Sequence, residues 1–129
     1  MESDVLVVDD SAAIRKILTR VLRQTGMAIQ TIHEAGDGQE ALTLMAQHRI
    51  DLVLSDINMP KMDGLQLLAS LKASSHWRNV PVVMITTEGG ETKVAEAVRL
   101  GAAGYVRKPF TADQIKEKLV GILEPAPTL

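Results

Sequence analysis

Polar side chains that can bind a metal or a phosphoryl group follow four short apolar segments of this chain. In chain order they are Asp9-Asp10, Asp56, Thr86-Thr87 and Lys108-Pro109. Open parallel sheets bind ligands outside the carboxyl ends of their strands, so we expect these side chains to converge at one edge. Three carboxylates gathered there would repel one another in their charged forms unless a cation compensates. The pattern therefore predicts a site for a hard divalent cation.

Magnesium suits such a site because it takes oxygen ligands and commonly binds through one or two carboxylates together with phosphate oxygens. Beside the metal, a remaining carboxylate can attack a phosphorus atom and form an acyl phosphate. We predict Asp56 as this nucleophile and Thr86 as a hydrogen-bond donor to a phosphoryl oxygen. Lys108 is predicted to neutralise the developing charge.

Each of these residues alone also has an ordinary structural explanation. Asp10 precedes Ser11 and can assist a helix amino terminus, while Asp56 and Thr86 can simply close strands. Lys108 alone is typical of a solvated surface charge. We favour a shared site because separate strands would otherwise place acids, a hydroxyl and an amine at one edge by accident.

The elements that must position these residues alternate along the chain. Valine-rich runs predict strands buried on both faces of a parallel sheet at Val5–Val8, Leu52–Leu54 and Val82–Ile85. The more polar segment Ala28–Ala35 predicts an edge strand. Gly104–Arg107 predicts a short last strand.

Helical spacing of apolar residues separates these strands. Ser11 is predicted to cap the first helix and Gly26 to follow its last turn. Further helices are predicted from Asp37-Gly38 onward, along Leu65, Leu68 and Leu71, and along Ile115, Leu119 and Ile122. Five strand and helix pairs indicate an α/β doubly wound parallel sheet with right-handed crossovers and helices on both faces.

Composition narrows the class of protein. A chain of 129 residues fits one domain, expected over residues 1–124, with 125–129 as a flexible tail or the start of a linker. The absence of cysteine excludes disulfides and thiolate metal sites. A formal charge of −2 with scattered basic residues predicts no nucleic-acid partner. Short apolar runs predict no membrane insertion, and we expect a cytoplasmic monomer.

The ordered set of motifs resembles the receiver domains of bacterial response regulators. It comprises Asp9-Asp10, the segment Leu54–Pro60 around Asp56, Asp63-Gly64, Thr86 and Lys108-Pro109, and the resemblance runs from about Asp4 to Leu123. It implies a flavodoxin-like (βα)5 fold of three layers with strand order 2-1-3-4-5. It also implies a Mg²⁺-dependent signalling switch that accepts a phosphoryl group, rather than an enzyme acting on a separate substrate.

The resemblance implies a role for each site residue. Asp56 would be the phospho-acceptor and, with Asp10, a direct Mg²⁺ ligand. Asp9 would act through water, and Asn58 through its backbone carbonyl. Lys108 would contact the phosphoryl group, and its bond to Pro109 resembles one that is cis in the family.

Thr86 and Tyr105 resemble the family's switch pair, in which the hydroxyl moves toward the phosphoryl group and the ring packs inward. Asn58 and Glu88 occupy the variable positions that modulate the site. The chemotaxis (CheY-like) type is the most similar, although Ile57 stands where well-known members carry tryptophan, and the lone Trp77 lies elsewhere.

Partners also follow from this resemblance. A histidine kinase would be the phosphodonor, a flagellar motor switch protein the target, and a phosphatase a further partner. The target would contact the fourth helix, fifth strand and fifth helix, including Val94, Tyr105 and Lys118. His33, His48 and His76 are dispersed in the sequence, so we expect surface residues and no metal site there.

Three alternatives differ in testable features. A haloacid-dehalogenase-type phosphatase also forms a phosphoaspartate, but it needs a second Asp where Asn58 stands. A flavodoxin-like cofactor protein would need a glycine- and hydroxyl-rich loop in place of Asp9-Asp10-Ser11. A receiver from another phosphorelay, or one cut from a longer regulator, shares every motif.

Overall fold

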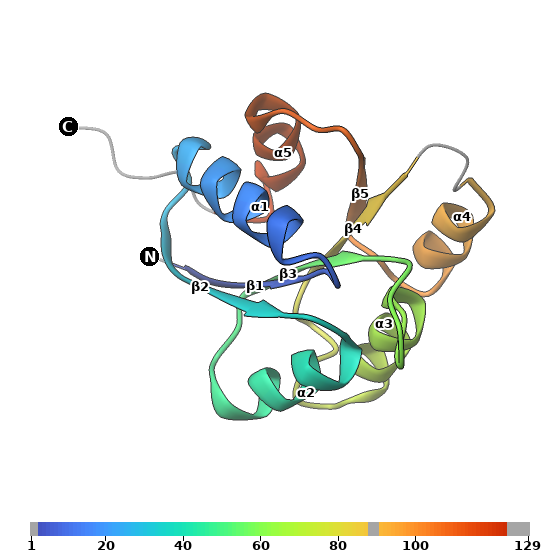
Figure 1. The fold of residues 1–129 in the computed structure, drawn as a ribbon. Helices are drawn as coiled ribbons and strands as arrows, with labels where there is room; N and C mark the ends of the chain where they lie inside the picture. The colour runs from blue at the N-terminus through green and yellow to red at the C-terminus, as the bar shows by residue number, and fades with distance from the viewer. Residues whose placement is uncertain (1–2, 88–90, 124–129) are drawn as a thin grey trace.

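Five parallel strands form one sheet in the order β2-β1-β3-β4-β5 (Figure 1). In this computed structural model, which describes residues 3–87 and 91–123, the strands are β1 (Ser3–Val8), β2 (Ile29–Ala35), β3 (Leu52–Asp56), β4 (Val82–Thr86) and β5 (Gly104–Arg107). The flavodoxin-like order expected from the sequence is confirmed. The order reverses between β1 and β3, which is where ligands of such sheets bind.

Five helices cover the two faces of the sheet and complete the three layers. One face carries α1 (Ala12–Gln24) and α5 (Ala112–Leu119), and the other carries α2 (Gly38–Gln47), α3 (Gly64–Ala73) and α4 (Glu91–Arg99) (Figure 1). None of the described helices is long and apolar enough to cross a membrane. The expected domain boundary after residue 124 and the tail lie outside the described residues.

The core is divided by the sheet because successive strand residues point to opposite faces. Val5 and Val7 pack with residues of α1 and α5, whereas Leu6 and Val8 pack with residues of α2, α3 and α4. Burial of each such side chain stabilises the fold by about 1.5–3 kcal/mol. Trp77 is half-buried and packs against the core on the face that carries α2, α3 and α4.

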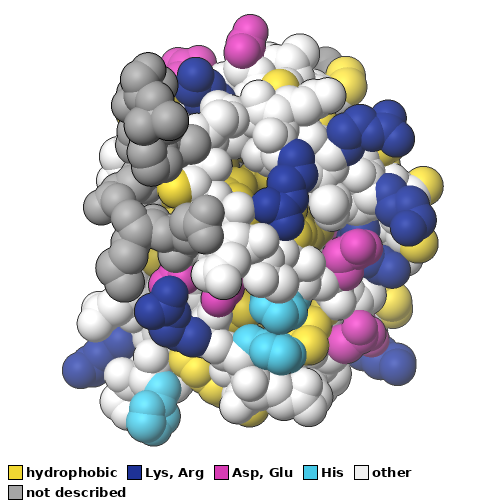
Figure 2. All heavy atoms as spheres, turned by 90° about the vertical axis from the view of Figure 1, so that its left-hand side faces the viewer, with side chains coloured by type: hydrophobic (Ala, Val, Ile, Leu, Met, Phe, Trp, Pro, Cys, Tyr) yellow, Lys and Arg dark blue, Asp and Glu magenta, His cyan; other side chains and the backbone are white. Residues whose placement is uncertain are grey.

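The edge strand β2 is more exposed than the fully buried strands β3 and β4, as its polar composition predicted. Gln30, Thr31 and Glu34 are exposed, while Ile29 and Ala35 are buried. Figure 2 shows the end of the molecule where the strands begin. Over the part of this surface formed by described residues, basic and acidic side chains are interspersed.

Caps delimit most helices where the sequence indicates. Ser11 Oγ accepts a hydrogen bond from the backbone N–H of Ile14 at 3.3 Å, and Gly26 follows the helix at a φ of +75°. Asp37 caps α2 in the same way. The expectation that Ile122 belongs to the last helix is wrong: α5 ends at Leu119, and Ile122 packs on the core from the turn that follows.

Gly64 allows the first turn of α3 to lie directly against the chain that leaves β3. Its backbone N–H donates a hydrogen bond to the Ile57 carbonyl oxygen at 2.8 Å. A Cβ at this position would overlap the Asp56 carbonyl oxygen and lie 2.9 Å from the Ile57 Cα atom. Because both neighbours are backbone, neither can rotate away. Glycine here sets how closely α3 approaches the site.

We predict that Gly64→Ala lowers the free energy of unfolding by about 1–3 kcal/mol, because the methyl group overpacks a backbone contact. Urea denaturation followed by circular dichroism measures this loss. Gly104→Ala is the matched control, since a Cβ there meets no atom within 4 Å and the φ of Gly104 is not in the left-handed region. Equal stability of Gly64→Ala and the wild type would contradict the proposed contact.

Candidate functional site

Three carboxylates meet where the adjacent strands β1 and β3 end. Asp9, Asp10 and Asp56 each offer an oxygen atom, and these atoms lie within 4.8 Å of one another. Asp9 is 1% exposed and Asp56 is 7% exposed, whereas Asp10 is open to solvent. The structure therefore brings together the three acids that the sequence selected.

Asp9 is held by contacts to both of its carboxylate oxygens. The backbone N–H of Ser11 donates to Asp9 Oδ1 at 2.9 Å, and Lys108 Nζ donates to Asp9 Oδ2 at 3.0 Å. The carbonyl oxygen of Asp9 accepts from Arg15 Nη1 at 2.6 Å, and Arg15 also pairs with Glu34 on β2 at 3.1 Å. These contacts fix the loop between β1 and α1.

Asp56 is largely buried yet only partly compensated. Its Oδ1 atom accepts from the backbone N–H of Ile57 at 2.9 Å, and its Oδ2 atom lies 3.6 Å from Lys108 Nζ. Burial raises the pKa of the Asp56 carboxyl above its usual value; the charge of Lys108 opposes this rise and the charge of Asp9 adds to it. The ionised carboxylate therefore favours a further cation beside it.

Thr86 and Lys108 lie at the ends of the neighbouring strands β4 and β5. The backbone N–H of Lys108 donates to the Thr86 carbonyl oxygen at 2.7 Å. Thr86 is 4% exposed, and its hydroxyl donates to the Thr87 carbonyl oxygen at 3.2 Å. The bond between Lys108 and Pro109 is cis, as the resemblance implied. Lys108 is thus paired with two site carboxylates rather than solvated alone.

Asn58 is the second residue after Asp56 and is exposed. Its Oδ1 atom accepts a hydrogen bond at 2.5 Å from Nζ of Lys93 on α4. Glu88, the other expected modulating residue, lies outside the described residues.

The expected partner face contains three residues in different settings. Val94 on α4 and Tyr105 on β5 are half-buried, and Lys118 on α5 is exposed. The Lys118 ammonium lies 5.5 Å from the centroid of the Tyr105 ring, within range for a cation–π contact. A hollow of about 290 Å³ lies on this face, lined by Tyr105, Val106, Arg107, Gln114, Glu117 and Lys118.

The histidines lie apart from the carboxylates. His48 and His76 are exposed, and His33 is half-buried with its ring stacked on that of His48 at 4.2 Å between centroids. Burial lowers the pKa of His33, and His48 lowers it further, while Asp4 opposes both. Among the described residues, the only group of acidic, histidine or cysteine side chains with metal-binding spacing is the aspartate cluster.

The three carboxylates fit a hard divalent cation on the chemistry of their donor atoms. Oxygen ligands with several open coordination positions suit Mg²⁺, and neither histidine nor thiolate is needed. Asp56 is also buried, and Lys108 offsets only part of the cost of its negative charge. This is a second feature that favours a bound cation.

Sequence reasoning missed three residues that shape the site. Arg15 binds the Asp9 backbone, Gly64 packs on Asp56, and Lys93 binds Asn58. Gly64 was present in the motif without a role, so its position after a capping aspartate was the available signal. Arg15 and Lys93 carry no local signal, because their partners depend on the tertiary fold.

Comparisons with known proteins show similarity to a single family over most of the chain. The family model described as response regulator receiver domain matches residues 5–120. The chemotaxis protein CheY-3 of Vibrio cholerae is 40% identical over 93% of this chain and 91% of its own length. The structure of Vibrio cholerae CheY4 superposes with a TM-score of 0.84 at 32% identity, covering 95% of this chain and all of that one. CheY in the CheX-CheY-BeF3-Mg complex of Borrelia burgdorferi has a TM-score of 0.82 at 32% identity, covering 93% and 88%.

We predict that Asp56→Asn raises the free energy of unfolding of the metal-free protein at pH 7 by on the order of 1 kcal/mol. The folded pKa of Asp56 lies above its unfolded value, so its favourable contribution is complete below about pH 4 and is lost as pH rises through the folded pKa. The neutral amide avoids that loss.

Urea denaturation of the wild type and the variant, measured from pH 3 to pH 8 without divalent cations, checks this prediction. The gain should be smallest at low pH and grow toward neutrality. Glu117→Gln on the exposed side of α5 serves as the control for removing one carboxylate charge. A variant no more stable than the wild type at pH 7 would show that ionised Asp56 is already compensated.

Proposed function

Because the chain belongs to the response regulator receiver domain family, we propose that it is a phosphorylation switch whose acceptor is Asp56. A histidine kinase supplies the phosphoryl group, and Mg²⁺ is the cofactor. Phosphorylation changes the face formed by α4, β5 and α5 and so controls a partner protein. The family consists of signalling proteins, and the chain catalyses only its own phosphorylation and dephosphorylation.

One observation supports this proposal most directly. A nearly buried carboxylate, Asp56, lies at the end of the central strand within reach of two further acids and 3.6 Å from a lysine ammonium. Asp10 and Asp56 are the direct metal ligands in this proposal, with Asp9 acting through water and Asn58 through its backbone carbonyl. Mg²⁺, when bound, supplies positive charge beside the phosphoryl oxygens and offsets the repulsion among the carboxylates.

The transfer step forms one bond and breaks another. An Oδ atom of Asp56 attacks the phosphorus atom of a phosphohistidine, the new P–O bond forms, and the P–N bond breaks. The imidazole keeps the electron pair and takes up a proton. Lys108 then pairs with a phosphoryl oxygen in place of Asp56, and the Thr86 hydroxyl donates to another phosphoryl oxygen.

The switch follows from the rearrangement of Thr86. In this structure its hydroxyl donates to the Thr87 carbonyl oxygen. A phosphoryl oxygen can replace that carbonyl as the acceptor. In the proposed active state Thr86 turns toward the phosphoryl group and the Tyr105 ring packs into the space released. The half-buried ring and its contact with Lys118 make this position sensitive to such a shift.

We further propose the chemotaxis pathway as the setting. The similar proteins named for chemotaxis support it, and the CheY of Borrelia burgdorferi is seen with CheX, beryllofluoride and magnesium. The proposed partners are the flagellar motor switch, contacted through Val94, Tyr105 and Lys118, and a phosphatase. The chain would act as a cytoplasmic monomer, with Glu88 and Asn58 modulating its kinetics.

The first test is phosphorylation itself. We predict that the wild type takes up label from a small acyl phosphate, such as acetyl phosphate, in the presence of Mg²⁺, and that Asp56→Asn takes up none because an amide is not a nucleophile. Mass spectrometry under acidic conditions measures the label. Asp10→Ala should be labelled only at raised Mg²⁺ concentration, since a direct ligand is lost. Full labelling of Asp56→Asn would exclude this acceptor.

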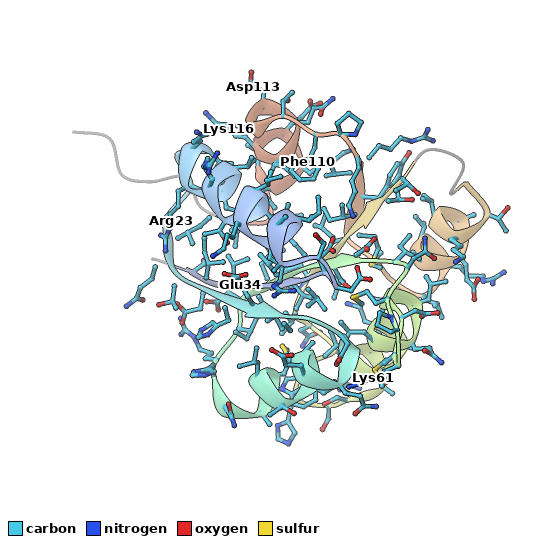
Figure 3. The ribbon with its side chains drawn as sticks, in the orientation of Figure 1. Arg23, Glu34, Lys61, Phe110, Asp113 and Lys116 are labelled. Atoms are coloured by element: carbon cyan, nitrogen blue, oxygen red, sulfur yellow. The ribbon has the colours of Figure 1, made fainter. Side chains whose placement is uncertain are left out.

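We also predict that Lys108→Ala still binds Mg²⁺ but switches poorly, because the metal ligands remain while the mobile cation is gone. Backbone amide NMR with Mg²⁺, before and after adding beryllofluoride, measures the response at Tyr105 and α4. In the wild type the shifts should begin at Asp56 and Thr86 and extend to Tyr105. Lys116→Ala on α5 (Figure 3) is the control for losing a lysine charge. A wild-type response at Tyr105 in Lys108→Ala would count against the mechanism.

A further inference from the structure

A long-range hydrogen bond joins α4 to the loop that follows the acceptor. Lys93 Nζ donates to Asn58 Oδ1 at 2.5 Å, across 35 positions of sequence. Bonds from an ammonium to an amide oxygen are charge-assisted and stronger than neutral ones. Figure 1 shows the segment between β3 and α3 beside α4 at the end of the sheet where the strands finish.

The bond fixes which end of the Asn58 amide faces α4. The carbonyl oxygen is occupied by Lys93, so the NH2 group is left for another partner. Within residues 3–87 and 91–123, no group accepts a hydrogen bond from that NH2. Asn58 therefore presents a hydrogen-bond donor to whatever lies opposite Lys93, as a phosphoryl group requires.

The position of Lys93 in α4 explains why its ammonium reaches away from the helix. Lys93 lies in the first turn of α4, where the helix dipole is positive and a cation is unfavourable. A partner outside the helix, with a partial negative charge, relieves this repulsion. Asn58 Oδ1 supplies it.

Little apolar burial holds α4 in place. Of residues 92–99, only Ala97 is buried, Val94 is half-buried and Val98 is 55% exposed. A polar bond near the start of such a helix therefore has a larger influence on its position than it would in a deeply packed helix. The Lys93 bond links that position to the segment beside Asp56.

We propose that Lys93 is a positioning residue that acts through Asn58 to lengthen the lifetime of the phosphorylated state. This inference rests on the proposed function. With the bond in place, the exposed Asn58 side chain, two residues after the nearly buried Asp56, is held in one orientation. Without it, the amide rotates freely and water reaches the phosphorus more often.

The step in question is hydrolysis of the acyl phosphate. A water oxygen attacks the phosphorus atom, the P–O bond to Asp56 breaks, and the carboxylate recovers the electron pair. Inorganic phosphate leaves with the new oxygen, and the two protons of the water go to the phosphate and to solvent. Lys93 takes no part in forming or breaking these bonds. In this proposal it fixes the Asn58 side chain, which limits the access of water to the phosphorus atom.

The first measurement uses the unphosphorylated, metal-free protein. We predict that Lys93→Ala moves the side-chain amide signals of Asn58 in a ¹⁵N-edited NMR spectrum toward those of a freely rotating amide. Lys93→Arg, which keeps a cationic donor, should leave them near their wild-type positions. Lys116→Ala, an exposed lysine on α5 (Figure 3), should not move them. Unmoved Asn58 signals in Lys93→Ala overturn the inference at this stage.

The second measurement is the decay of the labelled protein in excess Mg²⁺ after removal of the small phosphodonor. We predict that Lys93→Ala and Asn58→Ala lose the label faster by roughly two- to tenfold. The double variant should decay no faster than Asn58→Ala, because the lysine acts through the asparagine. Lys93→Arg should restore the wild-type rate, and Lys116→Ala should not change it.

The outcomes separate this inference from the function on which it depends. A wild-type chain that takes up no label overturns the proposed function together with the inference. Normal labelling with the same decay rate in Lys93→Ala overturns the inference alone. A double variant that decays faster than Asn58→Ala also overturns it, since the two substitutions would then act independently and Lys93 would not act through Asn58.

Discussion

Repulsion between carboxylates is the constraint on which the rest of the site depends. Parallel strands β1 and β3 are neighbours, so their carboxyl ends bring Asp9, Asp10 and Asp56 together. Lys108, which directly follows β5, compensates part of this charge. The remaining imbalance falls on Asp56, whose pKa is raised by burial. In the proposed function, a cation and then a phosphoryl group occupy this site.

Contacts with the surrounding structure keep Asp9 and Asp56 close together despite the repulsion between their charges. Asp9 is bound at both oxygens and through its backbone, and Gly64 presses α3 against the Asp56 backbone. Asp9 and Asp56 are therefore held close together, whereas Asp10 is open to solvent. By contrast, Thr86 and Asn58 make single side-chain bonds to partners that can be exchanged. The site thus combines two acids in fixed positions with hydroxyl and amide groups whose hydrogen bonds can be exchanged.

The sequence predicted the sheet, its edge strand and the acid cluster because each has a local physical signature. Valine runs report burial on both faces, and a residue that ends a parallel strand is placed by the topology alone. The end of α5 was predicted wrongly, since Ile122 keeps the apolar spacing of a helix although Val120 has already left helical geometry. The bond between Lys93 and Asn58 has no such signature, because the spacing between its partners is set by the packing of α4.

The shallow burial of α4 limits the free energy that phosphorylation must supply to shift this helix to another position. Ala97 is the one buried side chain among residues 92–99. For a helix with so little burial, we expect alternative positions only slightly higher in free energy. If the alternatives are populated at a few per cent, a differential interaction of about 3–5 kcal/mol with one chemical group is enough to make them dominant. A single phosphoryl group, with its charge-assisted hydrogen bonds, is within that range. A more deeply packed helix would be more stable, and phosphorylation of one residue would shift its position less.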